Sequence, residues 1–238
     1  MKAYILTIDN PTSRDYAAVC AKSCDDVGLD WEYFEGFQNM RGVHAWAQTG
    51  IKLTKNEGKP FNWPKKVDNP PVLKSTNAPE KAECCTAGHA AIWKKIAEGD
   101  DEVAVILEHD SIMLHPINIK IPDNRIVVLG YKTKDPKRYD HVKAGPPTGF
   151  KDIYGHEGAH AYAITKTTAQ SMIKEIETKG RLGCVDNAYF IGHQRKTKIP
   201  LCIMDPTPAI GWLRKSTIWQ TSADINYKFI DSFNKNYK

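Results

Sequence analysis

Residues 104–107, with the sequence AVIL, form a continuous apolar run that ends at Glu108 and Asp110. A short apolar run bounded by polar residues is typical of a strand that is buried on both faces. Strands of this kind belong to sheets that carry helices on each side. The run therefore constrains the chain to an α/β architecture, and it places acidic residues directly at the end of a buried strand.

The rest of the chain alternates strand patterns with helix patterns. Further strand candidates lie at residues 3–8, 31–34, 125–130 and 160–165. Helix candidates, with apolar residues at three- and four-residue spacing, lie at residues 13–28, 86–99 and 167–180. The expected N-caps are Ser13, Thr86 and Thr167, and the expected C-terminal stops are Gly28 and Gly180. This order predicts an α/β fold with a mostly parallel central sheet.

The chain has 238 residues, and we expect a single domain over residues 1–238. Residues 37–82 are rich in proline and are expected to form a long excursion over the surface, because proline interrupts regular elements. Residues 209–238 form an aromatic and basic C-terminal tail that could close over a ligand.

Cysteine use and charge limit the compartment and the partners. The N-terminal apolar run is too short for a signal peptide, and no run approaches the about 18 apolar residues of a membrane span. The six cysteines form no C-x-x-C pair, so we expect reduced thiols in a cytoplasmic protein without a membrane span, which leaves room for peripheral membrane contact. The net charge of +5 favours an anionic small-molecule ligand. A nuclease or phosphotransferase acting on nucleic acid would need a basic stripe, whereas Lys and Arg are interleaved here with 28 acids, so no nucleic-acid partner is expected.

The acids at the end of the apolar run have a predicted geometry. In an extended segment Glu108 and Asp110 point to the same side and His109 points to the other. Ligands of α/β sheets bind at the carboxyl ends of the strands. Two carboxylates at that edge form a binding site for Mn²⁺ or Mg²⁺. The ion would keep other coordination positions for diphosphate oxygens. The alternative from these residues alone is a pair of solvated acids in a turn.

Residues 85–110, CTAGHAAIWKKIAEGDDEVAVILEHD, resemble the central block of glycosyltransferase family 25, the lipooligosaccharide and procollagen galactosyltransferase group. That block has a Cys, three residues, a His, a helix that carries Trp, and an apolar strand ending in Glu-Asp-Asp. The matching residues are Cys85, His89, Trp93, Leu107, Glu108 and Asp110. Looser likenesses occur at the start of the chain, in LTIDNPTSR, at GAHAYAITKTTAQSMI, and at CVDNAYF, so the resemblance covers most of the chain.

The resemblance implies a GT-A-like nucleotide-diphospho-sugar transferase fold. It implies a metal-dependent inverting transfer of a hexose, galactose or glucose, from a UDP-sugar to a hydroxyl of a glycan or other acceptor, as in lipopolysaccharide biosynthesis. The implied cofactor is Mn²⁺ or Mg²⁺, with Asp110 as the leading ligand. Glu108 would share the metal or bind the ribose and sugar of the donor. Asp9 lies where a nucleoside would bind, and Arg14 could contact uracil or phosphate.

The remaining site residues each have a functional and a structural interpretation. Asp186 is the first candidate for the general base, and its alternative is a loop acid or an N-cap. His160 is a second candidate base or a further metal ligand, against a buried hydrogen-bonded histidine. His89 either contributes to the donor site near a helix N-terminus or is a satisfied, partly buried histidine. Arg214 could pair with donor phosphate or belong to a basic surface.

The sequence also departs from the family pattern. His109 replaces the middle acid, Gly88 replaces a Ser, Cys84 replaces a Gly, and Thr7 replaces an early Asn. These replacements support an alternative function: a catalytically impaired protein of the same fold that binds a nucleotide sugar or a glycan.

Overall fold

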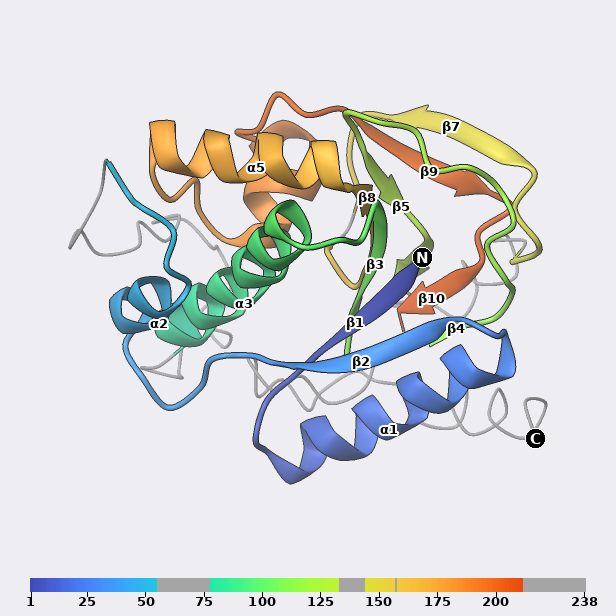
Figure 1. Ribbon diagram of the computed structural model, residues 1–238, viewed down its shortest axis with the longest axis horizontal. Coiled ribbons are helices and arrows are strands. Elements are labelled where there is room, and N and C mark those ends of the chain that lie inside the picture. Colours follow the sequence, from blue (N-terminus) through green and yellow to red (C-terminus); the bar gives the residue numbers. More distant parts are fainter. Residues whose placement is uncertain (55–77, 133–143, 157, 212–238) are drawn as a thin grey trace.

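The computed structural model describes residues 1–54, 78–132, 144–156 and 158–211 of the chain. Its centre is a seven-stranded sheet (Figure 1), in which β8 and β7 run opposite to the other strands. The strands in spatial order are β2 (Asp30–Glu35), β1 (Lys2–Thr7), β3 (Val103–Glu108), β8 (Ala161–Thr165), β5 (Ile126–Val128), β9 (Leu201–Asp205) and β7 (Gly149–Ile153). The prediction of an α/β fold with a mostly parallel central sheet is confirmed.

Helices cover the sheet on both faces, which explains the apolar runs of its central strands. Figure 1 shows α1 (Pro11–Asp26) on one side and α2 (Gly42–Gln48), α3 (Ala78–Glu98) and α5 (Lys166–Lys179) on the other. Successive residues of a strand alternate between these layers. Leu6 and Ile106 join the core under α3, whereas Ile5 and Leu107 join the core under α1. Each buried strand therefore needs apolar residues at every position.

The order of the strands creates a topological switch point at β1. The chain leaves β1 through α1 and returns on one side as β2, and it later passes through α3 to reach β3 on the other side of β1. Both neighbours run parallel to β1, and Leu6 lies opposite Glu108 in the register. In open α/β sheets, ligands bind in the crevice outside the carboxyl ends of the strands at such a point. The fold therefore marks the ends of β1 and β3 as a binding edge.

A three-stranded sheet continues from that edge. Its strands are β4 (Ser111–Met113), β10 (Ala209–Gly211) and β6 (Gly130–Lys132), with β10 in the middle. The Oγ of Ser23 in α1 accepts a hydrogen bond of 2.9 Å from the Met113 backbone N–H, which ties β4 to that helix. This small sheet closes the core under α1 beyond the end of β3.

The ends of the helices differ from the sequence prediction. The N-cap of α1 is Asn10, whose Oδ1 accepts from the Thr12 N–H at 3.0 Å, and not Ser13, which is buried and hydrogen-bonded to Thr7. The N-cap of α5 is Thr165 and not Thr167. The predicted stop at Gly180 is confirmed, and its φ of +80° is one that glycine adopts without strain. A polar side chain caps a helix only if the preceding chain turns there, which sequence alone leaves open.

The predicted excursion and tail contain regular structure. Within residues 37–82 the chain forms α2, and α3 begins at Ala78, two turns before the predicted N-cap Thr86. Proline is tolerated in the first turn of a helix, so Pro79 did not prevent this start. Ala209–Gly211 pair as β10, and the rest of the tail lies outside the described residues, as do residues 55–77. In the described part of the chain, no helix has the length and apolar character needed to cross a bilayer.

Candidate functional site

Glu108 is the last residue of β3, and the chain turns directly after it. Its backbone N–H donates to the His160 carbonyl oxygen at 2.8 Å, and Ser111 donates to the same oxygen through its hydroxyl. His109 and Asp110 form the turn between β3 and β4. The prediction that residues 108–110 are extended is therefore wrong, because strand pairing stops at Glu108. The alternation that would put both acids on one side does not apply.

The two acids meet different helices. The side chain of Glu108 lies toward α3, where its Oε1 is 3.2 Å from His89 Nε2. The charge of Asp110 affects a residue of α1. Burial, the neighbouring Cys24 and this charge together raise the pKa of the Cys20 thiol. The His109 ring also faces α1 and stacks on Tyr16 at 5.9 Å between centroids. Glu108 is thus oriented by α3, and the turn that follows is packed against α1.

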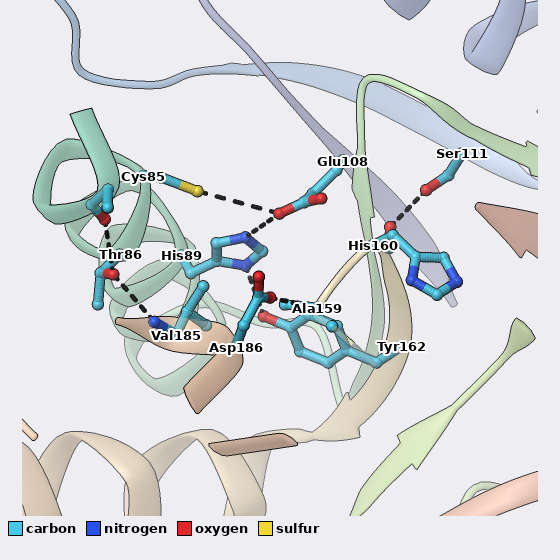
Figure 2. Close-up of polar contacts among 12 residues, drawn as sticks. Cys85, Thr86, His89, Glu108, Ser111, Ala159, His160, Tyr162, Val185 and Asp186 are labelled. Atoms are coloured by element: carbon cyan, nitrogen blue, oxygen red, sulfur yellow. Dashed lines mark hydrogen bonds and ion pairs between the residues drawn. The ribbon is translucent and has the colours of Figure 1, made fainter. Parts of the chain in front are cut away.

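A chain of hydrogen bonds through the core holds Glu108 (Figure 2). The Trp93 indole N–H donates to the Tyr162 hydroxyl oxygen at 2.7 Å. The same hydroxyl lies 2.9 Å from His89 Nδ1, and His89 Nε2 faces Glu108. Trp93, His89 and Tyr162 are each fully buried, so the chain reaches Glu108 from inside the protein.

The direction of these bonds follows from what each group can donate. An indole N–H only donates, so the Tyr162 oxygen is an acceptor from Trp93. A buried hydroxyl hydrogen needs its own acceptor, and His89 Nδ1 is in place for it. The remaining ring hydrogen of a neutral His89 is then on Nε2 and is donated to Glu108. Burial raises the pKa of Tyr162 well above its ordinary value, so this hydroxyl keeps its hydrogen.

Cys85 completes the group around Glu108. Its Sγ is 3.9 Å from Glu108 Oε1, and it lies one helical turn before His89 on α3. The three potential ligand atoms of Cys85, His89 and Glu108 lie within 4.8 Å of one another. Within the described ranges, this is the one group of at least three such residues that is close enough to hold a metal ion. Sulfur and nitrogen donors suit Zn²⁺ or Co²⁺, whereas Mn²⁺ and Mg²⁺ prefer oxygen ligands.

Asp186 lies beside this group. It is the first residue of a helical turn, η2 (Asp186–Phe190), and its Oδ1 accepts from the Ala159 N–H at 2.9 Å. The preceding Val185 N–H donates to Thr86 Oγ1 at 3.0 Å, which fixes this segment to α3. Burial, with smaller effects from Asp186 and Glu108, raises the pKa of the Cys184 thiol to about 12. Both carboxylates therefore contribute to the raised pKa of this partly buried thiol.

Asp9 and Arg14 lie in the segment after β1 and are exposed. Asp9 follows the end of β1, and its backbone oxygen accepts from the Gln38 side chain at 2.7 Å. Arg14 forms an ion pair with Glu35, the last residue of β2. Arg14 is thus drawn toward β2, and a donor molecule would compete with Glu35 for it.

Other predicted site residues lie elsewhere. His160 is fully buried, and Figure 2 shows its ring turned away from His89; the ring lies 5.3 Å from that of His156. The backbone of His160, rather than its ring, contacts the site through Glu108. Arg214 lies outside the described residues. The His89 side chain has 0% exposure, and its Nε2 faces Glu108.

Sequence analysis missed several members of the site. Tyr162, Cys184 and the Ala159 N–H were read as parts of strands or turns, and Cys85 as a motif residue without a function. The spacing of Cys85 and His89 did carry a signal, since residues four apart share one helix face. Nothing in the sequence indicated that this face meets Glu108, because the contact depends on how α3 crosses the end of β3.

Comparison with solved structures finds chains that are similar to this one at low sequence identity. It is similar to the galactosyltransferase LgtC in complex with donor and acceptor sugar analogs, at 12% identity, covering 99% of this chain and 96% of that one, with a TM-score of 0.45. An active-site mutant of LgtC gives 10% identity, the same coverage and a TM-score of 0.44. A glycosyltransferase involved in glycosylation of the major capsid of PBCV-1 gives 12% identity, 75% and 66% coverage, and a TM-score of 0.31. No family model and no curated protein matches the sequence.

Proposed function

We propose that this protein is a GT-A-type glycosyltransferase of the family 25 kind. It would move a hexose, galactose or glucose, from a UDP-sugar to a hydroxyl group of a glycan or other acceptor. The similar solved structures are a galactosyltransferase and a glycosyltransferase, and one of them is a complex with donor and acceptor sugar analogs. This agrees with the substrate class that the sequence motifs imply.

The observation that carries the proposal is the polar group at the topological switch point. Glu108 ends β3 next to the end of β1, where α/β sheets bind ligands. It is held by the buried His89 and Tyr162, and Asp186 follows Val185, whose N–H donates to Thr86 of the same helix, α3. Several buried polar groups that together orient one carboxylate at a binding edge are typical of a functional site.

The proposed reaction is a single displacement at the anomeric carbon. The acceptor oxygen forms the new glycosidic bond while the bond to the UDP oxygen breaks, and the acceptor proton passes to a carboxylate. Asp186 is the proposed base: Oδ1 accepts from the Ala159 N–H, so Oδ2 would take the proton. Attack opposite to the leaving group inverts the anomeric configuration, and UDP departs with the electron pair of the broken bond.

The remaining proposed roles concern donor binding. Asp9 and Arg14 would hold the nucleoside and phosphate, and Glu108 would hold the donor sugar or share a metal with Asp110. A divalent metal supplies charge neutralisation for the leaving diphosphate when bound. The residues fit Mn²⁺ or Mg²⁺ in part: Asp110 and Glu108 offer carboxylate oxygens, but the Glu108 Oε1 is directed to His89 and Cys85.

The test is a thermal-shift screen of nucleotide sugars with and without Mn²⁺, followed by donor hydrolysis and transfer assays. We expect a UDP-hexose to raise the midpoint of unfolding, more so with Mn²⁺. Asp110→Asn should remove metal-stimulated hydrolysis without lowering the unfolding midpoint of the ligand-free protein. Wild-type hydrolysis in Asp110→Asn would contradict the metal role, and a product with retained configuration, seen by NMR, would contradict the single displacement.

One observation favours the alternative, a nucleotide-sugar- or glycan-binding protein without turnover. His109 replaces the family acid and packs against Tyr16 of α1, so the turn holds one acid fewer than the family pattern. Calorimetric titration with UDP separates the two functions. Metal-dependent UDP binding without hydrolysis or transfer to any acceptor would support the alternative.

A further inference from the structure

We propose that Cys85, His89 and Glu108 form a binding site for a borderline divalent metal ion such as Zn²⁺. This site shares Glu108 with the proposed donor site but does not use Asp110, the leading ligand of the proposed Mn²⁺ or Mg²⁺. It does not depend on whether the protein transfers sugar. The three residues come from two rigid elements, since Cys85 and His89 share one face of α3 and Glu108 ends β3. Figure 2 shows the thiol, the imidazole and the carboxylate directed toward one another.

The distances between the ligand atoms match those of a tetrahedral zinc site. With ordinary bond lengths, a tetrahedral Zn²⁺ places its nitrogen and oxygen ligands about 3.3 Å apart and its sulfur and oxygen ligands about 3.6 Å apart. His89 Nε2 and Glu108 Oε1 are 3.2 Å apart, and Cys85 Sγ and Glu108 Oε1 are 3.9 Å apart. These two distances lie within a few tenths of an ångström of the tetrahedral values, and the third, between the Cys85 sulfur and the His89 nitrogen, is at most 4.8 Å.

The charges also balance. Cys85 would bind as a thiolate after releasing its proton to solvent, and Glu108 would bind as a carboxylate. These two negative groups neutralise the doubly charged ion, and His89 adds a neutral nitrogen. Cys85 and Glu108 are partly exposed while His89 is fully buried, so an ion can reach the site from the side of Cys85 and Glu108. Three protein ligands leave a fourth position for water or a ligand, as in catalytic zinc sites.

The Tyr162 hydroxyl contacts the ring nitrogen of His89 that would not bind the metal. A histidine that binds a metal through one ring nitrogen usually donates its other N–H to a fixed acceptor. On metal binding the His89 hydrogen would move from Nε2 to Nδ1, where the Tyr162 hydroxyl oxygen lies 2.9 Å away. That oxygen can accept from both His89 and Trp93. The Tyr162 hydrogen loses His89 as its acceptor in this state, which limits the affinity of the site.

The test uses the full-length protein, stripped with a chelator and titrated with Co²⁺, whose absorption reports its ligands. We expect one equivalent to bind with a thiolate-to-cobalt charge-transfer band in the near ultraviolet, and Zn²⁺ to displace it. Cys85→Ser should remove the band. Cys84→Ser is the matched control, because that neighbouring thiol points to the Met40 carbonyl, and it should keep the band. Tyr162→Phe should weaken metal binding by about 10- to 100-fold.

Two outcomes would overturn the site: a wild-type protein without the band, and a band that persists in Cys85→Ser. Thermal unfolding of each metal-free variant checks that it is folded. Asp110→Asn separates this site from the proposed glycosyltransferase metal, since it should lower Mn²⁺-stimulated hydrolysis and leave the cobalt band unchanged. A protein that shows the band but transfers no sugar would refute the proposed function and leave the zinc site standing.

Discussion

Tyr162 is the residue on which the candidate site depends most. Its hydroxyl accepts from Trp93 and reaches His89, and both partners are fully buried. A buried polar group that loses its partner cannot turn to water instead. The hydroxyl therefore matters for stability as well as for the orientation of Glu108.

Tyr162→Phe should lower the free energy of unfolding by about 1–3 kcal/mol, because it leaves buried donors or acceptors on Trp93 and His89 without this partner. Urea denaturation measures the change. Tyr33→Phe is the control: this tyrosine is 43% exposed, and its hydroxyl can bond to water, so we expect a change below about 0.5 kcal/mol. Equal effects of the two substitutions would show that the buried chain adds no stability.

Asp186→Asn tests the role of Asp186 as the proposed general base, again at the scale of a single residue. The amide keeps an oxygen for the Ala159 N–H, so the fold and UDP binding should be retained. Transfer should fall by roughly 10²- to 10⁴-fold, the usual contribution of a general base. Steady-state kinetics and UDP titration measure the two properties. Loss of UDP binding would instead make Asp186 a donor or metal residue.

At the scale of elements, the segment that carries Asp186 is joined to α3 by a buried ion pair. Arg181 contacts Glu83 of α3, and their side chains are only 5% and 4% exposed. Thr86, one turn further along α3, accepts from the Val185 N–H. The position of Asp186 therefore depends on α3, which also carries Cys85 and His89.

Removal of one partner of this ion pair should be costly. Arg181→Met leaves the Glu83 carboxylate buried without its guanidinium, and we expect a loss of about 3–5 kcal/mol in the free energy of unfolding. The matched control is Glu98→Ala, which breaks the exposed pair with Lys94 on the same helix. That change should cost less than about 0.5 kcal/mol. Chemical denaturation of both variants gives the comparison, and a small loss in Arg181→Met would mean that the pair is hydrated in solution.

At the scale of the whole molecule, four of the six cysteine thiols are buried and the other two, Cys85 and Cys184, are partly buried. None of the six cysteines, all of which are in the described part of the chain, forms a disulfide. Burial raises the pKa of Cys84 to about 11 and, together with smaller charge effects, that of Cys184 to about 12. The folded protein therefore holds these protons at a pH where the unfolded chain releases them.

This predicts a loss of stability in alkali. Each such thiol stabilises the fold fully below its unfolded pKa near 9, and this contribution disappears as the pH rises through the folded pKa. Between pH 8 and 10 we expect the free energy of unfolding to fall by on the order of 1 kcal/mol for each shifted thiol. Urea denaturation across this range measures the slope. Cys184→Ala should make the slope shallower, and an unchanged slope would show that this thiol is hydrated.

The sequence alone determined the layered architecture. The apolar runs in β1, β3 and β8 require burial on two faces, and only helices on both sides of a sheet supply it. The sequence also determined that Glu108 ends a central strand, because the change from apolar to acidic residues occurs between neighbouring positions of the chain. The helix starts at Ser13, Thr86 and Thr167 were wrong because several polar residues near each start could act as the cap. The turn at His109 was missed because strand pairing, and not residue type, ends the extended backbone there.

Only the tertiary structure decided which groups surround Glu108. The crossing of α3 brings Cys85 and His89 to this carboxylate, the pairing of β8 places Tyr162 next to His89, and the start of η2 adds Asp186. These residues are up to about a hundred positions apart in the chain, as with Cys85 and Asp186. Local patterns fix what a segment can form because they act through neighbouring residues. Contacts between distant segments follow from how whole elements pack, and the candidate metal site and its hydrogen-bond chain are contacts of that kind.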